Sequence, residues 1–155
     1  SLLGDLVDTL TTKAIHAAFA AAIRGIEPRF AYKADATWHH DPRARDTELD
    51  GAALRNFYIV FGAAKPSDLW TGGAGRAYTC NCFVVTSYAG VEFAELEHML
   101  VDDGSDLLRV LGMLRDPALP GLADVIALGL GGERFDSSEN VIIEHRFAIH
   151  WHQAT

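Results

Sequence analysis

The segment 141–152 reads VIIEHRFAIHWH, and its residues alternate between two sets. Successive side chains of a β-strand point to opposite faces, so residues two apart share a face. One face would carry Val141, Ile143, His145, Phe147, Ile149 and Trp151. The other face would carry Ile142, Glu144, Arg146, Ala148, His150 and His152. The alternation predicts a closing strand, which we extend over residues 140–153.

Three further strands are predicted before this one. Residues 122–130 pair with the closing strand in a hairpin, and the polar residues 131–139 form the turn. Residues 56–61 read NFYIVF, and aromatic and β-branched side chains favour strands. Residues 77–88 alternate in the same way as the closing strand.

Two segments have the apolar spacing of amphipathic helices. From Leu3 to Arg24 apolar residues recur every three or four positions, and a glycine and a proline follow as a stop signal. A second helix begins near Glu92, is interrupted at Asp103-Gly104 and continues to Leu114. The order of helix, strands, helix and strands predicts an α+β fold. We expect a mostly antiparallel sheet on which the N-terminal helix and the mid-chain helix pack.

Two long loops, at about 33–55 and 63–76, separate these elements. Loops of this length in a compact domain are uncommon and usually have a function or a partner. Two of the three tryptophans lie in these loops, and tryptophan often anchors an interface. The interface candidates are Trp38, Arg43, Arg45, Trp70 and Arg76. We expect both loops to be exposed; the alternative is that they fold back onto the monomer.

The composition indicates one domain, residues 1–155, with a net charge of −8 from 13 Lys and Arg against 21 Asp and Glu. No apolar run reaches the roughly 18 residues that a membrane helix needs, so we expect no membrane contact. The acidic balance argues against a protein that grips nucleic acid, because that affinity comes largely from neutralising phosphates. Two cysteines cannot form a disulfide framework.

No catalytic signature is present. The run GGAGR at 72–76 has the spacing of neither phosphate-binding loop motif. Cys80 and Cys82 share a strand face, and buried apolar filling is favoured over redox chemistry. Four aspartates are predicted at helix ends or turns, where capping explains them without acid–base chemistry: Asp102, Asp103, Asp106 and Asp136. We therefore expect no enzyme activity and no cofactor.

His150 and His152 are the candidates for a metal site, since they lie about 7 Å apart on one strand face. His39 and His40 are further candidate ligands. A lone H-x-H pattern is more typical of polar residues on an edge or interface strand, so we expect no bound metal.

The order of the elements resembles the tail terminator (tail-completion) proteins of long-tailed bacteriophages. The resemblance covers most of the chain and includes the strands around 57–61 and 82–85, the helix 92–114 and the closing hairpin ending at 138–151. It implies a structural virion protein that forms a hexameric ring on the last ring of the tail tube protein. The ring would end tube growth and join the tail to the head-tail connector and neck proteins.

The resemblance also implies assembly in the cytoplasm of the bacterial host and a final location in the tail or neck of the virion. DNA would pass through the lumen without specific binding. The chain departs from the shortest members of this group because both long loops are expanded.

Two other functions remain open. A helix over a curved antiparallel sheet can enclose a pocket, and a small-molecule-binding domain would line it with Phe57, Phe61, Cys82, Val84 and Phe147. A metal-dependent hydrolase built on the four histidines is the less favoured alternative.

Overall fold

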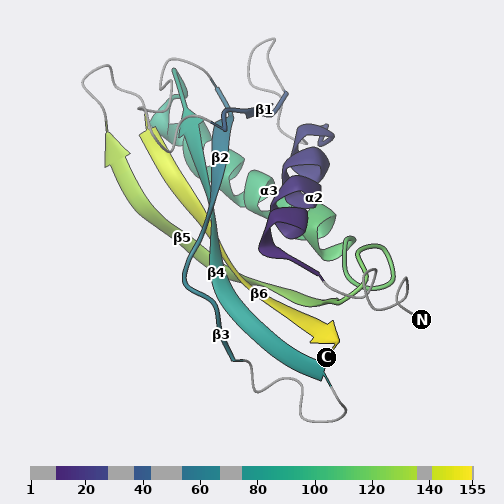
Figure 1. The fold of residues 1–155 in the computed structure, drawn as a ribbon. Coiled ribbons are helices and arrows are strands. Elements are labelled where there is room, and N and C mark those ends of the chain that lie inside the picture. The colour runs from purple at the N-terminus through teal and green to yellow at the C-terminus, as the bar shows by residue number, and fades with distance from the viewer. Residues whose placement is uncertain (1–9, 28–36, 43–53, 67–74, 136–140, 155) are drawn as a thin grey trace.

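Figure 1 shows a curved sheet with two helices on one of its faces. The computed structural model describes residues 10–27, 37–42, 54–66, 75–135 and 141–154. In chain order the elements are α2 (Thr12–Arg24), β1 (His39–His40), β2 (Asn56–Phe61), β3 (Lys65–Pro66), β4 (Gly75–Tyr88), α3 (Phe93–Gly112), β5 (Leu122–Phe135) and β6 (Val141–Ala154). The predicted α+β fold is therefore confirmed.

The sheet has the order β1-β2-β4-β6-β5, and β3 also pairs with β4. β6 pairs with β4 over its whole length, from Val141 opposite Tyr88 to Ala154 opposite Gly75. The pairings of β2 and β3 with β4 and of β5 with β6 are antiparallel as well, whereas the short β1 runs parallel to β2. β5 is thus an edge strand of a mostly antiparallel sheet, as Figure 1 shows.

Helix α2 begins at Thr12, although the apolar spacing predicts a helix from Leu3. Residues 1–9 lie outside the described part of the chain. Thr11 has an extended backbone, and its hydroxyl accepts a hydrogen bond of 3.1 Å from the amide of Ala14. The prediction of one unbroken helix is wrong, because this threonine caps the helix that follows it.

Helix α3 is continuous, so the predicted interruption at Asp103-Gly104 is also wrong. Asp103 is buried in an ion pair with Arg55, which holds this turn of the helix against the sheet. Glycine in a helix interior costs about 1 kcal/mol relative to alanine, and tertiary contacts outweigh that cost here.

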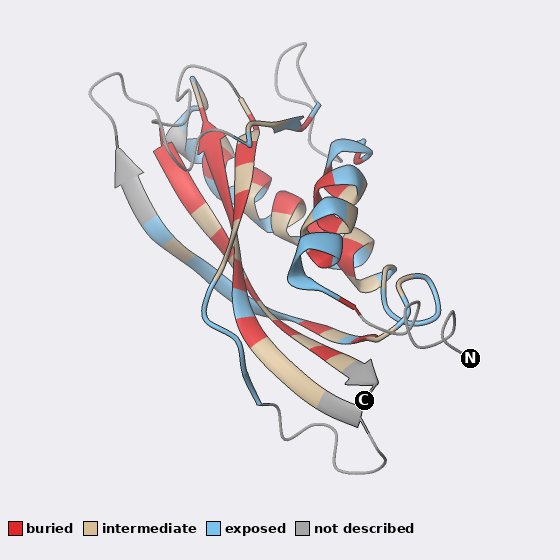
Figure 2. Ribbon diagram, in the orientation of Figure 1, coloured by how far each residue is buried: buried red, intermediate tan, exposed pale blue. Residues whose placement is uncertain are grey.

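The core lies between the two helices and the face of the sheet that they cover (Figure 2). Burial along β6 follows the predicted alternation. The buried set is Val141, Ile143, His145, Phe147, Ile149 and Trp151, joined from the other face by Ile142. α2 contributes Ile15, Phe19, Ala20 and Ile23. The covered face is therefore the one that the sequence pattern identifies.

β5 extends to Phe135, beyond the predicted end at residue 130. Its backbone passes directly beneath two charged side chains of β6 on the uncovered face. A Cβ atom at Gly131 would overlap the guanidinium of Arg146, and one at Gly132, where φ is +61°, would overlap the carboxylate of Glu144. The two glycines let the strand continue where a turn is predicted, because they leave room for the Glu144–Arg146 ion pair.

We predict that Phe147→Ala lowers the free energy of unfolding by about 3–5 kcal/mol, because a fully buried ring leaves a cavity. Phe83→Ala is the matched control. Phe83 is only partly buried on the other face of the sheet, so its loss should be clearly smaller. Urea denaturation followed by circular dichroism measures both, and equal losses would contradict this account of the core.

Candidate functional site

A buried ion pair lies beneath α3. Nε and Nη2 of Arg55 donate to Oδ2 and Oδ1 of Asp103, each over 2.9 Å, and neither side chain is exposed to solvent. The two parallel hydrogen bonds match the planar guanidinium to the carboxylate. This geometry offsets the high cost of removing both charges from water.

Tyr88 and His145 extend this pair into a connected group, which we call the buried polar cluster. The hydroxyl of Tyr88 donates to Oδ2 of Asp103 over 2.9 Å, and its oxygen lies 2.7 Å from Nε2 of His145. The single hydroxyl proton of Tyr88 is used in the hydrogen bond to the Asp103 carboxylate. The tyrosine oxygen therefore accepts the hydrogen bond from Nε2–H of His145. A neutral imidazole protonated at Nε2 carries an acceptor lone pair on Nδ1.

Burial fixes the protonation of two members of the cluster. It lowers the pKa of His145 to about 3, so the imidazole is neutral near pH 7. Burial, followed by the charge of Asp103, raises the pKa of Tyr88, so the phenol keeps its proton. Burial also raises the pKa of Asp103, while the hydrogen bonds and charge of Arg55 lower it.

The backbone of Arg55 joins three parts of the fold. Its φ of 57° lies in the left-handed region, which costs a residue with a side chain about 1 kcal/mol. Its amide donates to the carbonyl of Ser87 over 2.8 Å, and its carbonyl accepts from the amide of His39 over 2.9 Å. Through these two backbone hydrogen bonds and its ion pair with Asp103, Arg55 links β4, the start of β1 and the middle of α3.

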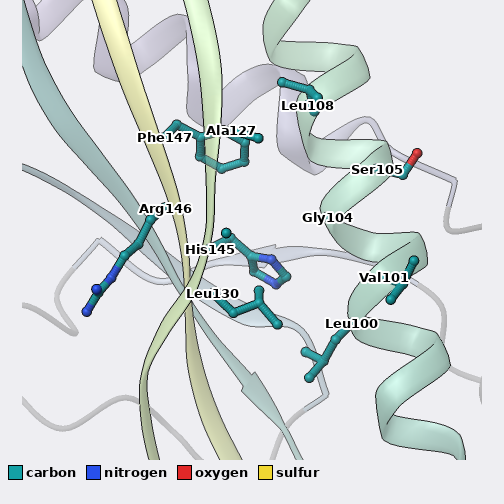
Figure 3. Close-up of a pocket in the computed structure, with 11 residues that line it drawn as sticks. Leu100, Val101, Gly104, Ser105, Leu108, Ala127, Leu130, His145, Arg146 and Phe147 are labelled. Carbon is teal, nitrogen blue, oxygen red and sulfur yellow. The ribbon is translucent and has the colours of Figure 1, made fainter.

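A groove of about 350 Å³ lies beside the buried polar cluster, between α3 and the strands β5 and β6 (Figure 3). From the helix it is lined by Leu100, Val101, Gly104, Ser105 and Leu108. From the strands it is lined by Ala127, Gly129, Leu130, His145, Arg146 and Phe147. The imidazole of His145 points from β6 toward the helix, whereas the Arg146 side chain points away from it. The walls are therefore largely apolar.

β5 exposes apolar side chains at the edge of the sheet. The exposed fractions are 40% for Ile126, 51% for Leu128 and 49% for Leu130, and we call these three residues the β5 edge patch. Ile126 lies opposite Ala148 on the uncovered face, and Leu130 lies opposite His145 on the covered face. Single exposed apolar residues are ordinary, but an apolar edge strand is an aggregation hazard unless something covers it.

The prediction that Trp38 is exposed is wrong. Its side chain is 3% exposed and packs edge-on against the ring of Phe57, with the guanidinium of Arg55 5.8 Å from the indole centroid. Arg55, placed by the sequence at the end of the same exposed loop, is buried as well. At these positions the loop 33–55 folds back onto the monomer, which is the alternative that the sequence left open.

The loop 63–76 is also shorter than predicted, because Lys65–Pro66 forms β3 and β4 already begins at Gly75. Arg76 is therefore part of β4, paired with Gln153, rather than a loop residue. The remaining interface candidates, Arg43, Arg45 and Trp70, lie outside the described residues.

The structure does not bring the four candidate histidines together. His40 packs against Phe57 and lies near His16, on the covered face. His150 and His152 belong to the opposite face of β6, as the burial alternation shows. Within the described ranges, no three His, Cys, Asp or Glu side chains are grouped so that they could hold a metal ion.

The candidate cysteines and aspartates are buried or helical. Cys80 and Cys82 are unbridged core residues, as predicted, and burial raises the pKa of Cys80 to about 11. The expectation that aspartates cap helix ends fails for Asp102, Asp103 and Asp106, which lie within α3, the last two buried. Asp136 lies outside the described residues.

The pocket predicted for a small molecule is filled by the core. Phe57, Cys82 and Val84 are completely buried, and partly buried Phe61 packs against the same cluster. Phe147 alone of the five lines the groove beside α3.

The buried polar cluster was not predicted from the sequence, although one signal for it is present there. His145 occupies the apolar face of the closing strand, where a polar side chain needs a buried partner. Val84 of β4 lies opposite His145 of β6, so their side chains share a face of the sheet. Tyr88 is four residues after Val84 in the same strand and therefore lies on that face as well. The distant partners Arg55 and Asp103 have no local signature.

A comparison with protein-family models and a search of curated proteins both found no match for this chain. Among the helices that the structure describes, none is long and apolar enough to cross a membrane.

We predict that Asp103→Leu lowers the free energy of unfolding by about 3–5 kcal/mol, because it leaves the charge of Arg55 buried without its partner. The double variant Arg55→Met with Asp103→Leu should recover most of this loss, since no buried charge remains. Thermal and urea unfolding measure both. A double variant as unstable as the sum of two single variants would contradict the pairing.

We predict a pH-dependent loss of stability that His145→Gln removes. The folded protein keeps His145 neutral down to a pKa of about 3, whereas the unfolded chain binds a proton near pH 6.5. The unfolded state therefore binds more protons between these values, and stability falls as the pH drops from 6.5 toward 3. One such group contributes a slope of up to about 1.4 kcal/mol per pH unit. The prediction is contradicted if the free energy of unfolding falls with pH equally in the unmodified chain and in His145→Gln.

Proposed function

We propose that this chain is a structural subunit that assembles into a ring, closes the tail tube of a long-tailed bacteriophage and joins the tail to the neck proteins. The observation that carries the proposal is the β5 edge patch, in which an edge strand exposes apolar side chains on both faces. Such an edge also presents backbone groups that another chain can pair with. A second copy of the chain would cover it.

A closed ring requires one surface of each subunit to meet a different surface of the next. The β5 edge patch supplies one of these two surfaces in the proposal. The ring of six, the tail tube protein and the head-tail connector as partners come from the resemblance in the order of elements. The α+β fold, with its N-terminal helix, mid-chain helix and closing hairpin, supports that resemblance.

The charge of the chain fits a conduit for DNA. Each copy carries a net charge of −8, and a share of this charge would line the lumen of the proposed ring. Acidic groups there would repel phosphates and keep a passing duplex from binding. The protein would have no catalytic task and would reside in the tail or neck of the virion after assembly in the host cytoplasm.

We predict that Leu128→Lys prevents assembly while the subunit stays folded. Leu128 is half exposed, so the substitution should change the free energy of unfolding by no more than about 0.5 kcal/mol. A charge in an apolar interface would remain desolvated without a partner. Native mass spectrometry should give multiples of the 16.9 kDa subunit for the unmodified chain and the subunit mass for the variant.

Met113→Lys is the matched control, because it makes the same charge change at a residue that is 68% exposed just beyond α3. It should assemble like the unmodified chain. The proposal fails if the unmodified chain stays monomeric even with assembled tail tubes present, or if Leu128→Lys assembles normally.

A further inference from the structure

The edge of the sheet opposite β5 has an open strand segment of its own. β1 pairs with β2 only at Asn56 and Phe57, and β3 pairs with β4. Among the residues that the structure describes, no strand pairs with the outer side of residues 58–61. The described sheet therefore has two open edges, one along β5 and one along β2 (Figure 1).

The backbone hydrogen bonds show which groups of β2 point outward. On the outer side, the carbonyl of Phe57 accepts from the amide of Asp41 over 2.8 Å, whereas the amide of Gly62 donates to β4 over 2.8 Å. The backbone groups of successive strand residues alternate in direction. Ile59 and Phe61 therefore direct their N–H and C=O groups outward, as Phe57 does, and no backbone group in the described ranges bonds to them there.

The sequence of β2 lacks the residues that keep an edge strand from pairing. Edge strands are ordinarily protected by charged side chains or proline. Residues 56–61 read NFYIVF and contain neither, whereas Lys65 and Pro66 of β3, both exposed, protect the next stretch of this edge. The segment of β5 that carries the β5 edge patch, residues 125–130, reads VIALGL and is uncharged as well. Each open edge thus has one short apolar segment without such protection.

The directions of the strands allow these two segments to meet. β2 is antiparallel to β4, β4 to β6, and β6 to β5, so β2 and β5 run in opposite directions within one copy. Rotation about an axis that runs along the strands keeps these directions in every copy. β5 of one copy and β2 of the next are then antiparallel, which is the more stable pairing per residue.

We propose that residues 58–61 of β2 are the second surface of the subunit contact and pair antiparallel with residues 125–130 of β5 from a neighbouring copy. The inference rests on the proposed ring and names the surface that meets the β5 edge patch. Such pairing continues the sheet from copy to copy and gives the outward backbone groups of Ile59 and Phe61 their partners. The competing arrangement is a closed dimer through two β5 edges, which leaves β2 uncovered.

Cysteine cross-linking between two single variants tests the pairing. Val60 lies on the uncovered face, because it is opposite Phe83, which is opposite Arg146. Ile126 lies on the same face. Val60→Cys and Ile126→Cys chains are mixed in equal amounts and treated with a short bismaleimide reagent, which joins nearby thiols on one face. We expect a cross-linked dimer in the mixture and only traces of it with either variant alone.

The unmodified chain is the control, and it should give no cross-linked dimer because Cys80 and Cys82 are buried. Native mass spectrometry of the same chain separates this inference from the proposed function. A chain that stays monomeric contradicts the ring and the pairing together. Rings whose mixed variants give no more dimer than the single variants would overturn the pairing and leave the ring intact. Ile126→Cys chains that cross-link to one another as well as the mixture does would also overturn it, in favour of the closed dimer.

Discussion

The buried ion pair between Arg55 and Asp103 fixes the middle of α3 against the sheet. It connects the turn before β2 to the middle of α3, and it does so without exposure of either side chain to water. Two buried charges are tolerated only when their geometry satisfies both, and the two parallel hydrogen bonds provide that geometry. The left-handed backbone of Arg55 is held in place by the same contacts.

The position of α3 follows from this pair. With Asp103 fixed, the next residue, Gly104, faces His145 of β6, and among the strands α3 packs mainly against β5. Ile126, Leu128 and Leu130 of β5 still keep apolar surface in contact with water. The groove between α3 and the strands β5 and β6 depends on where this helix is held.

Local patterns predicted the sheet well and the helices less well. Alternation along residues 141–152 identified both the strand and its covered face, because a strand with one buried face repeats its environment every two residues. The stretch Asp103-Gly104 has the composition of a helix break, and only the distant Arg55 makes it part of a continuous helix. Arg55 itself lies at the end of a charged stretch that reads as an exposed loop.

Local sequence patterns do not reveal distant contacts, and this also explains why the candidate site differs from the predicted one. Trp38 was expected at an interface because its neighbours in the sequence are polar, yet it packs beside Arg55 in the interior. The groove draws residues from α3, β5 and β6, which are joined only by tertiary packing. Of the groove residues, Phe147 was among the predicted pocket residues, whereas His145 was a polar residue in an apolar row that was not singled out.

Hydrogen–deuterium exchange of β5 as a function of protein concentration tests whether the uncovered edge strand is where another copy binds. If another copy binds there, the amides of residues 126–130 exchange fast in dilute protein and slow progressively as the concentration rises, while those of α2 stay unchanged. Exchange in β5 that is independent of concentration, in a sample whose mass shows assembled rings, would contradict it.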